Sequence, residues 1–138
     1  MSKEPIEFLK HIYEECSYLL SIKESLTKED FLNDETLKRA VVRSLEIIGE
    51  ATKKIPADFK VKWNSIHWKN MAGMRDRLIH DYIGVNYSIV WDVFKNKIPE
   101  LSRQIAPVLV LQSGRCMVLS PATVAWAMVP QLITSKLR

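Results

Sequence analysis

Three residues in the segment MAGMRDRLIHDYIG, residues 71–84, have side chains suited to phosphodiester chemistry: Arg75, His80 and Tyr82. Arginine stays cationic at any working pH and can hold a phosphate through two parallel hydrogen bonds, whereas histidine exchanges protons near neutrality. An arginine followed five places later by a histidine therefore favours RNA strand scission without a metal ion. The alternative is that Arg75 and His80 are ordinary surface residues near a helix end, because this spacing also occurs by chance.

The spacing of Arg75 and His80 restricts how the two side chains can meet. Residues five apart on an ideal α-helix point about 140° away from each other. Either the helix ends or distorts between them, or two copies of the chain bring their motifs together across a twofold axis, which predicts an isologous homodimer. In such a cleft His80 would act as base or acid, and Arg75 would stabilise the crowded phosphorane, leaving a cyclic 2′,3′-phosphate.

Two neighbouring residues are candidate supporting groups. Asp76 precedes His80 by four residues, so on a helix its carboxylate could orient the imidazole and favour the charged form. Arg77 and Asp81 are also four apart. The alternative for each pair is an exposed helix salt bridge, which contributes only about 0.3 to 0.5 kcal/mol.

Other chemistries find little support in the sequence. No phosphate-binding glycine-rich loop, dinucleotide fingerprint, zinc-protease motif or hydrolase elbow occurs, and no bound metal or cofactor is expected. Cys16 and Cys116 are too far apart in sequence for a zinc or redox motif, and Cys16 is expected to be a small buried hydrophobe. His11 and His67 have no partner at metal-ligand spacing. The four tryptophans, Trp63, Trp68, Trp91 and Trp126, are interpreted as core or interface anchors.

Composition and charge indicate one globular, helical domain with a basic middle. The chain has 138 residues, is 47% hydrophobic and 26% charged, and holds only 4 glycines. Residues 1–37 carry 4 Lys/Arg against 9 Asp/Glu, whereas residues 38–97 carry 12 against 6. A basic centre suits a polyanion such as RNA, although a solvated helix face gives the same imbalance. The charged start, MSKEPIEF, is unlike a secretory peptide, so we expect a cytoplasmic protein.

Apolar periodicity predicts an all-α fold. Helices are expected over about residues 5–24, 34–54 and 68–82, with a fourth after Asn86, and short links between them favour an antiparallel four-helix bundle. Thr27 with Asp30 resembles a capping box. Gly84 is expected to end the third helix in a left-handed turn, and Pro99 to kink the fourth.

Residues 112–138 differ from the rest of the chain. Their apolar run is interrupted by Pro121 and Pro130, shows no helical period and is too short to span a bilayer. We therefore divide the chain into a helical domain, 1–111, and an atypical tail, 112–138. The tail is open to three interpretations: it is disordered, it packs on the bundle, or it reflects an altered reading frame.

Two stretches resemble a known family. LKRAVVRSLEIIGEATKKIP, from Leu37, and WKNMAGMRDRLIHDYIGVNYSIVWDVFKNKIPEL, from Trp68, look like the HepT-type toxins of the HEPN superfamily, and the likeness covers about residues 5–110. Many members carry asparagine directly after the motif arginine, where this chain has Asp76. The tail has no counterpart that we recognise in the family.

The resemblance implies a homodimeric helical bundle with metal-independent ribonuclease activity, in which Arg75 and His80 of both copies line one cleft. It implies a toxin paired with a minimal nucleotidyltransferase antitoxin, which silences such proteins by transferring nucleotide monophosphate (AMPylation) onto the motif tyrosine, here Tyr82. Two alternatives stay open: a noncatalytic helical module that docks a nucleotidyltransferase, and a protein that only binds nucleic acid.

Overall fold

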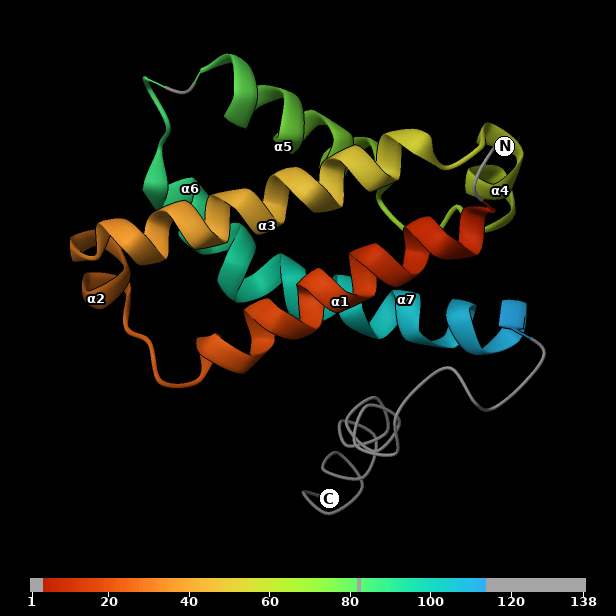
Figure 1. Cartoon of the computed structure of the whole chain (residues 1–138), viewed down its shortest axis with the longest axis horizontal. Helices are drawn as coiled ribbons and strands as arrows, with labels where there is room; N and C mark the ends of the chain where they lie inside the picture. The colour runs from red at the N-terminus through yellow and green to blue at the C-terminus, as the bar shows by residue number, and fades with distance from the viewer. Residues whose placement is uncertain (1–3, 82, 114–138) are drawn as a thin grey trace.

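The computed structural model describes residues 4–81 and 83–113, and every regular element in these ranges is helical. Four long segments run alternately up and down and form an antiparallel bundle (Figure 1). The predicted all-α bundle is confirmed. The elements in chain order are α1 Pro5–Lys23, α2 Lys28–Asn33, α3 Glu35–Lys54, α4 Ala57–Lys62, α5 Trp68–His80, α6 Tyr87–Asp92, the π-helical turn η1 Val93–Lys97, and α7 Ile98–Ser113.

The bundle core is built from the apolar stripes that the sequence pattern predicts. On α1, Leu9, Ile12, Cys16 and Leu19 are fully buried against α3 and α7. Burial of each large aliphatic side chain stabilises the fold by roughly 1.5 to 3 kcal/mol. Burial also raises the pKa of the Cys16 thiol to about 12, so the thiol stays protonated and packs as a small hydrophobe, as predicted.

Side-chain caps set where three of the helices begin. Thr27 and Asp30 form the predicted capping box at the start of α2, and the Asp34 carboxylate accepts from the backbone N–H of Leu37 at the start of α3. The Asn86 side chain caps α6 by accepting from the N–H groups of Ser88 and Ile89. Each cap of this kind stabilises a helix by about 1 kcal/mol, so these polar residues fix the lengths of the links.

A π-helical turn interrupts the last long segment directly before Pro99. The backbone N–H of Ile98 donates to the carbonyl of Val93, five residues earlier, which is the hydrogen bond of a π-helix. Proline has no N–H and its ring crowds the carbonyl four residues before it, here Lys95 inside the turn. The structure thus has a widened turn directly before Pro99, the residue at which we expected a kink.

The end of α5 differs from the sequence prediction. The helix ends at His80, where Asp81 is the C-cap with φ −104° and its N–H donates to the carbonyl of Arg77. The prediction that Gly84 ends this helix in a left-handed turn is wrong, since the φ angle of Gly84 lies outside the left-handed region and the residue lies beyond the helix end. The motif helix is thus shorter than expected, and His80 is its last residue.

Nothing in the described helices has the length and apolar character needed to cross a bilayer. Most of the tail, with Cys116 and Trp126, lies outside the described residues, as does Tyr82. The division of the chain at residue 111 therefore stays a prediction, and α7 continues to Ser113.

Candidate functional site

Helix α5 holds both residues of the predicted catalytic pair. It is a regular α-helix from Trp68 to His80, so it neither ends nor distorts between Arg75 and His80. By the helical period their side chains leave the axis about 140° apart. The structure thus excludes the possibility that a break in the helix brings these two groups together within one chain.

Arg75 lies on the side of α5 that packs against α3, and only 23% of its side chain is exposed. This close packing depends on Gly49 of α3. A Cβ atom at position 49 would lie 2.2 Å from the Cβ of Arg75 and 2.8 Å from the carbonyl oxygen of Met71. Glycine is therefore required at the crossing, and it sets the register of α3 against the motif helix.

Two carboxylates contact the Arg75 guanidinium. Glu50 Oε2 lies 3.1 Å from Arg75 Nε, and Asp76 Oδ1 accepts from Arg75 Nη1 at 2.9 Å. The Nε atom is buried and makes no aligned hydrogen bond within the described residues, so the Glu50 contact is an ion pair in which the N–H does not point at the oxygen. Glu50 and Asp76 together hold the guanidinium in a fixed place between α3 and α5.

Of the two interpretations of Asp76, an imidazole-orienting group or a member of a salt bridge, the structure shows the second. Its Oδ1 accepts from Lys53 Nζ on α3 at 2.7 Å as well as from Arg75, and no hydrogen bond joins it to His80 in the described part of the chain. The hydrogen bonds from Lys53 and then from Arg75 hold the pKa of the Asp76 carboxyl below its ordinary value. The negative charge of Asp76 is thus directed at the cations between the helices.

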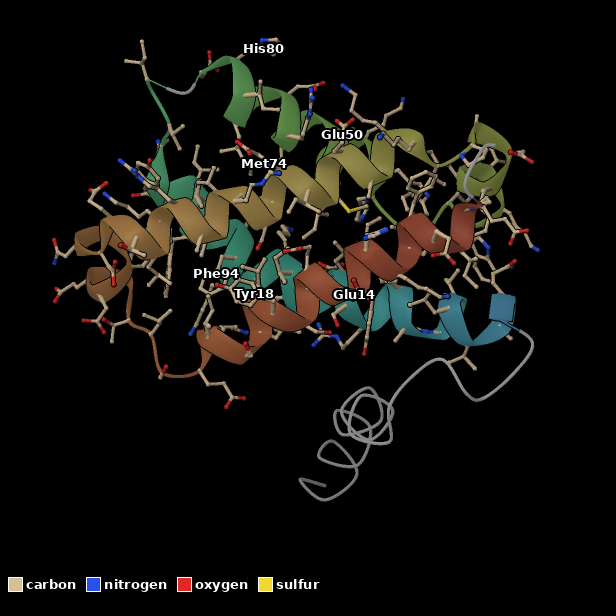
Figure 2. All side chains as sticks on the ribbon, in the orientation of Figure 1. Glu14, Tyr18, Glu50, Met74, His80 and Phe94 are labelled. Carbon is tan, nitrogen blue, oxygen red and sulfur yellow. The ribbon has the colours of Figure 1, made fainter. Side chains whose placement is uncertain are left out.

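His80 is exposed at the outer end of α5 and points away from the bundle, as Figure 2 shows, while Glu50 lies below it on α3. Its neighbour Ile79 is 39% exposed, and Ile83, just past the helix, is 87% exposed. The end of α5 thus presents two apolar side chains to solvent beside the imidazole.

A groove of about 280 Å³ opens beside Arg75 between α1, α3 and α5. Its lining includes the cationic side chains of Arg43, Lys54 and Arg75, together with the imidazole of His11. Glu46 and Glu50 also line it, and Arg43 pairs with Glu46 at 3.5 Å. The cationic side chains of this groove outnumber its carboxylates by one, so the groove suits a negatively charged chain that approaches Arg75.

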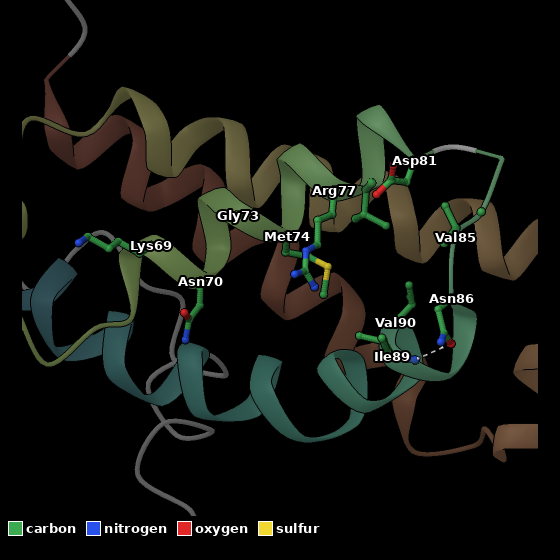
Figure 3. Close-up of a pocket in the computed structure, with 12 residues that line it drawn as sticks. Lys69, Asn70, Gly73, Met74, Arg77, Asp81, Val85, Asn86, Ile89 and Val90 are labelled. Carbon is green, nitrogen blue, oxygen red and sulfur yellow. Dashed lines mark hydrogen bonds between the residues drawn. The ribbon is translucent and has the colours of Figure 1, made fainter.

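Arg77 faces a different groove from Arg75. In Figure 3 its guanidinium extends from α5 beside Met74 into a groove of about 640 Å³ between α5 and α6, which Asp81 and Asn86 also line. Arg77 and Asp81 form no ion pair within 4 Å among the described residues. The salt bridge that four-residue spacing allows is therefore absent there, and Arg77 does not lie with Arg75.

The described residues contain no group of three His, Cys, Asp or Glu side chains placed to hold a metal ion. The groups gathered at the motif helix are instead a guanidinium, an ammonium and two carboxylates, with an imidazole at the helix end. This set can bind an anion and exchange a proton.

The sequence around this site is shared with known proteins. The family model described as "Ribonuclease HepT-like" matches residues 12–108. This range includes all of α3, α5, α6 and η1 and most of α7. The chain belongs to the HepT-like ribonuclease family. The resemblance seen in the motif is thereby confirmed at the level of the family.

Individual members of the HepT-like family cover most of the chain. A protein of Caldanaerobacter subterraneus subsp. tengcongensis, named "Putative RNase TTE0752", is 49% identical over 107 residues, which are 78% of this chain and 96% of that protein. "Putative RNase MJ0127" of Methanocaldococcus jannaschii is 41% identical over 107 residues, 78% of this chain and 88% of that protein. "Probable ribonuclease HepT" of Thermococcus cleftensis is 43% identical over 101 residues, 73% of this chain and 92% of that protein. No solved structure gives a significant match.

Reasoning from the residues alone missed three positions on α3 that support the HepT-like motif: Gly49, Glu50 and Lys53. One signal was present, because a glycine inside an amphipathic helix costs about 1 kcal/mol and usually has a packing reason. The roles of Glu50 and Lys53 carried no comparable signal. Their partners are on α5, and only the register of the two helices brings them together.

Proposed function

We propose that this protein is a metal-independent endoribonuclease whose active site is completed by two copies of the chain. Arg75 of one copy and His80 of the other would converge on one scissile phosphate. The observation that carries the proposal is the uninterrupted helix α5, which directs Arg75 toward α3 and leaves His80 in solvent beside Ile79 and Ile83. Membership of a ribonuclease family supports RNA as the substrate.

The chemistry of the proposed site follows from the two side chains. One His80 imidazole removes the proton of a ribose 2′-hydroxyl, whose oxygen attacks the adjacent phosphorus. The bond to the 5′-oxygen breaks, and that leaving oxygen takes a proton from water. Arg75 stabilises the negative charge of the phosphorane. The products are a cyclic 2′,3′-phosphate and a free 5′-hydroxyl, and acid–base catalysis of this kind contributes about 10²- to 10⁴-fold in rate.

The proposed ribonuclease would act as the toxin of a toxin–antitoxin pair. Its antitoxin would be a minimal nucleotidyltransferase that binds the chain and transfers AMP to Tyr82. The added phosphate would place negative charge two residues from His80, where the RNA phosphate must bind.

RNA cleavage in EDTA tests the proposed activity. Wild-type protein should cut RNA with the chelator present, and the products should carry cyclic phosphates. The variants Arg75→Ala and His80→Ala should lose at least about a hundredfold in rate. His80 is exposed, so His80→Ala should melt like wild type. Cleavage that survives both substitutions would exclude Arg75 and His80 as the site.

The proposed regulation has a separate test. Co-expression with a nucleotidyltransferase encoded beside this chain should add one or more AMP masses to the peptide that holds Tyr82, and Tyr82→Phe should abolish the addition. Modified protein should no longer cut RNA. Intact-mass measurement reports the modification directly, and an unmodified Tyr82 in a tight complex would limit the antitoxin to inhibition by binding.

One observation favours the alternative of a noncatalytic docking module. The Arg75 guanidinium is already contacted by Glu50 and Asp76, which reduces its attraction for a phosphate. A docking module would form a stable complex with the nucleotidyltransferase and would leave RNA intact. The EDTA assay with isolated protein separates the two functions.

A further inference from the structure

One oxygen atom between α3 and α5 accepts hydrogen bonds from two cations. Asp76 Oδ1 accepts from Arg75 Nη1 at 2.9 Å and from Lys53 Nζ at 2.7 Å. Lys53 lies on α3 and the other two residues lie on α5, so the arrangement bridges the two helices. The side chains of Lys53 and Asp76 are 41% and 42% exposed, so solvent and solutes can reach this oxygen.

A guanidinium and an ammonium that meet at one anionic oxygen form the donor set that binds a phosphate oxygen. Arginine supplies directed N–H donors, and lysine supplies a compact charge with three donors. The four charges in contact here are those of Glu50, Lys53, Arg75 and Asp76, and they cancel. Both cations are therefore neutralised as long as the Asp76 carboxylate remains between them.

We propose that Lys53 is a second phosphate-binding residue of the active site, and that the Asp76 carboxylate occupies the position of a phosphate oxygen until RNA displaces it. The inference rests on the proposed function, because it takes Arg75 as the residue that binds the scissile phosphate. RNA arrives, Asp76 turns toward solvent, and a non-bridging phosphate oxygen accepts from Arg75 and Lys53 in its place.

Two features of the structure make this exchange feasible. Ion pairs between exposed side chains contribute little to stability, so the carboxylate is displaced at small cost. The second carboxylate, Glu50, contacts the opposite part of the guanidinium at Nε, and Gly49 keeps α5 close against α3. Arg75 therefore keeps its place when Asp76 leaves.

The test measures binding of a fluorescent single-stranded RNA by anisotropy over a range of salt concentrations, in full-length protein carrying His80→Ala to prevent cleavage. Lys53→Gln should weaken binding about tenfold, the scale of a hydrogen bond to a charged group. It should also lower the slope of log affinity against log salt by about 0.7, because one fewer phosphate is neutralised. Lys53→Arg should restore most of the affinity.

A matched control and a double variant make the result specific. Lys28, at the start of α2, is exposed and forms no ion pair with a described residue, so Lys28→Gln removes the same charge away from the site. Asp76→Asn should strengthen binding several-fold when Lys53 is present, and this gain should shrink when Lys53→Gln is added. A residue that only supports the fold would not produce this dependence.

Three outcomes would overturn the inference. Lys53→Gln could bind RNA as Lys28→Gln does, Asp76→Asn could weaken binding, or the gain from Asp76→Asn could be unchanged without Lys53. Failure of the proposed function gives a different result, because then wild-type protein does not cut RNA in EDTA. If wild type cuts RNA and Lys53→Gln behaves like its control, only the role of Lys53 is lost.

Discussion

Arg75 and His80 lie five residues apart on one helix but in opposite surroundings. Arg75 packs against α3, where Gly49 admits it and two carboxylates contact its guanidinium. His80 is the last residue of α5, is exposed, and makes no hydrogen bond through its ring within the described residues. One member of the pair is thus held in place by its own chain, whereas the other makes no such contact with the residues that the structure describes.

This difference suggests that the chain itself positions Arg75 and that a second copy positions His80. A side chain that binds a phosphate in one geometry benefits from a fixed position. Its conformational entropy is then already lost on folding and does not oppose binding of the phosphate. An imidazole that completes a site across an interface can be oriented by the second copy. The contrast between the middle and the end of α5 is therefore what a site shared by two chains would produce.

The largest effect should come from removing the fixed position of Arg75. Gly49→Val places a Cβ 2.2 Å from the Cβ of Arg75 and 2.8 Å from a backbone oxygen, so α3 and α5 must separate. We expect a loss of about 3 kcal/mol or more in the free energy of unfolding, together with loss of RNA cleavage. Chemical denaturation measures the first quantity.

The matched control for this change is Gly73→Ala on α5. Nothing lies within 4 Å of a Cβ at position 73, so alanine should keep the fold and add up to about 1 kcal/mol through helix propensity. If Gly49→Val unfolded at the same denaturant concentration as wild type, close packing at Gly49 would not be what positions Arg75.

A smaller effect should come from the exposed end of α5. Ile83→Asp would bury an unpaired carboxylate if this surface is covered by a second copy, so dimer affinity should fall at least about tenfold and cleavage should fall with it. Light scattering after size exclusion reports the mass. Val61→Asp is the control, because Val61 is 73% exposed on α4, away from His80. Equal effects of the two substitutions on dimer affinity would show that the surface beside His80 is not the dimer interface.

The smallest effect concerns Asp76 and pH. Hydrogen bonds from Lys53 and Arg75 lower the folded-state pKa of its carboxyl below the ordinary 3.8, so its charged form stabilises the fold. This contribution is present above the ordinary value and is lost as pH falls through the lowered one. Wild type should melt slightly above Asp76→Asn at neutral pH, and the difference should vanish in strongly acidic buffer. If the difference in melting temperature grew as the pH fell, the pKa of Asp76 would be raised in the folded state and not lowered.

Features that depend on nearby residues were predicted well. The apolar period located α1, α3 and α5 within a few residues, and Thr27, Asp34 and Asn86 cap helices as their side chains suggest. These outcomes follow from local chemistry, since a cap or an amphipathic stripe needs only residues within one or two turns.

Features that depend on the register between helices were not predicted. Four-residue spacing suggested that Asp76 pairs with His80, but Lys53 lies 23 residues away in sequence and contacts Asp76 across the helix crossing. The attraction of the Asp76 carboxylate to two cations at one oxygen is stronger than its attraction to a single exposed imidazole. Gly84 was likewise given a role at a helix end that Asp81 takes three residues earlier.

Mixing two inactive variants tests the shared site most directly. Arg75→Ala and His80→Ala should each fail to cut RNA in EDTA. When the two are unfolded together, refolded and mixed, heterodimers hold one intact Arg75 and one intact His80 on different chains. We expect cleavage to reappear in proportion to the heterodimer measured by native mass spectrometry. Abundant heterodimer without any cleavage would contradict a site that joins Arg75 of one copy to His80 of the other.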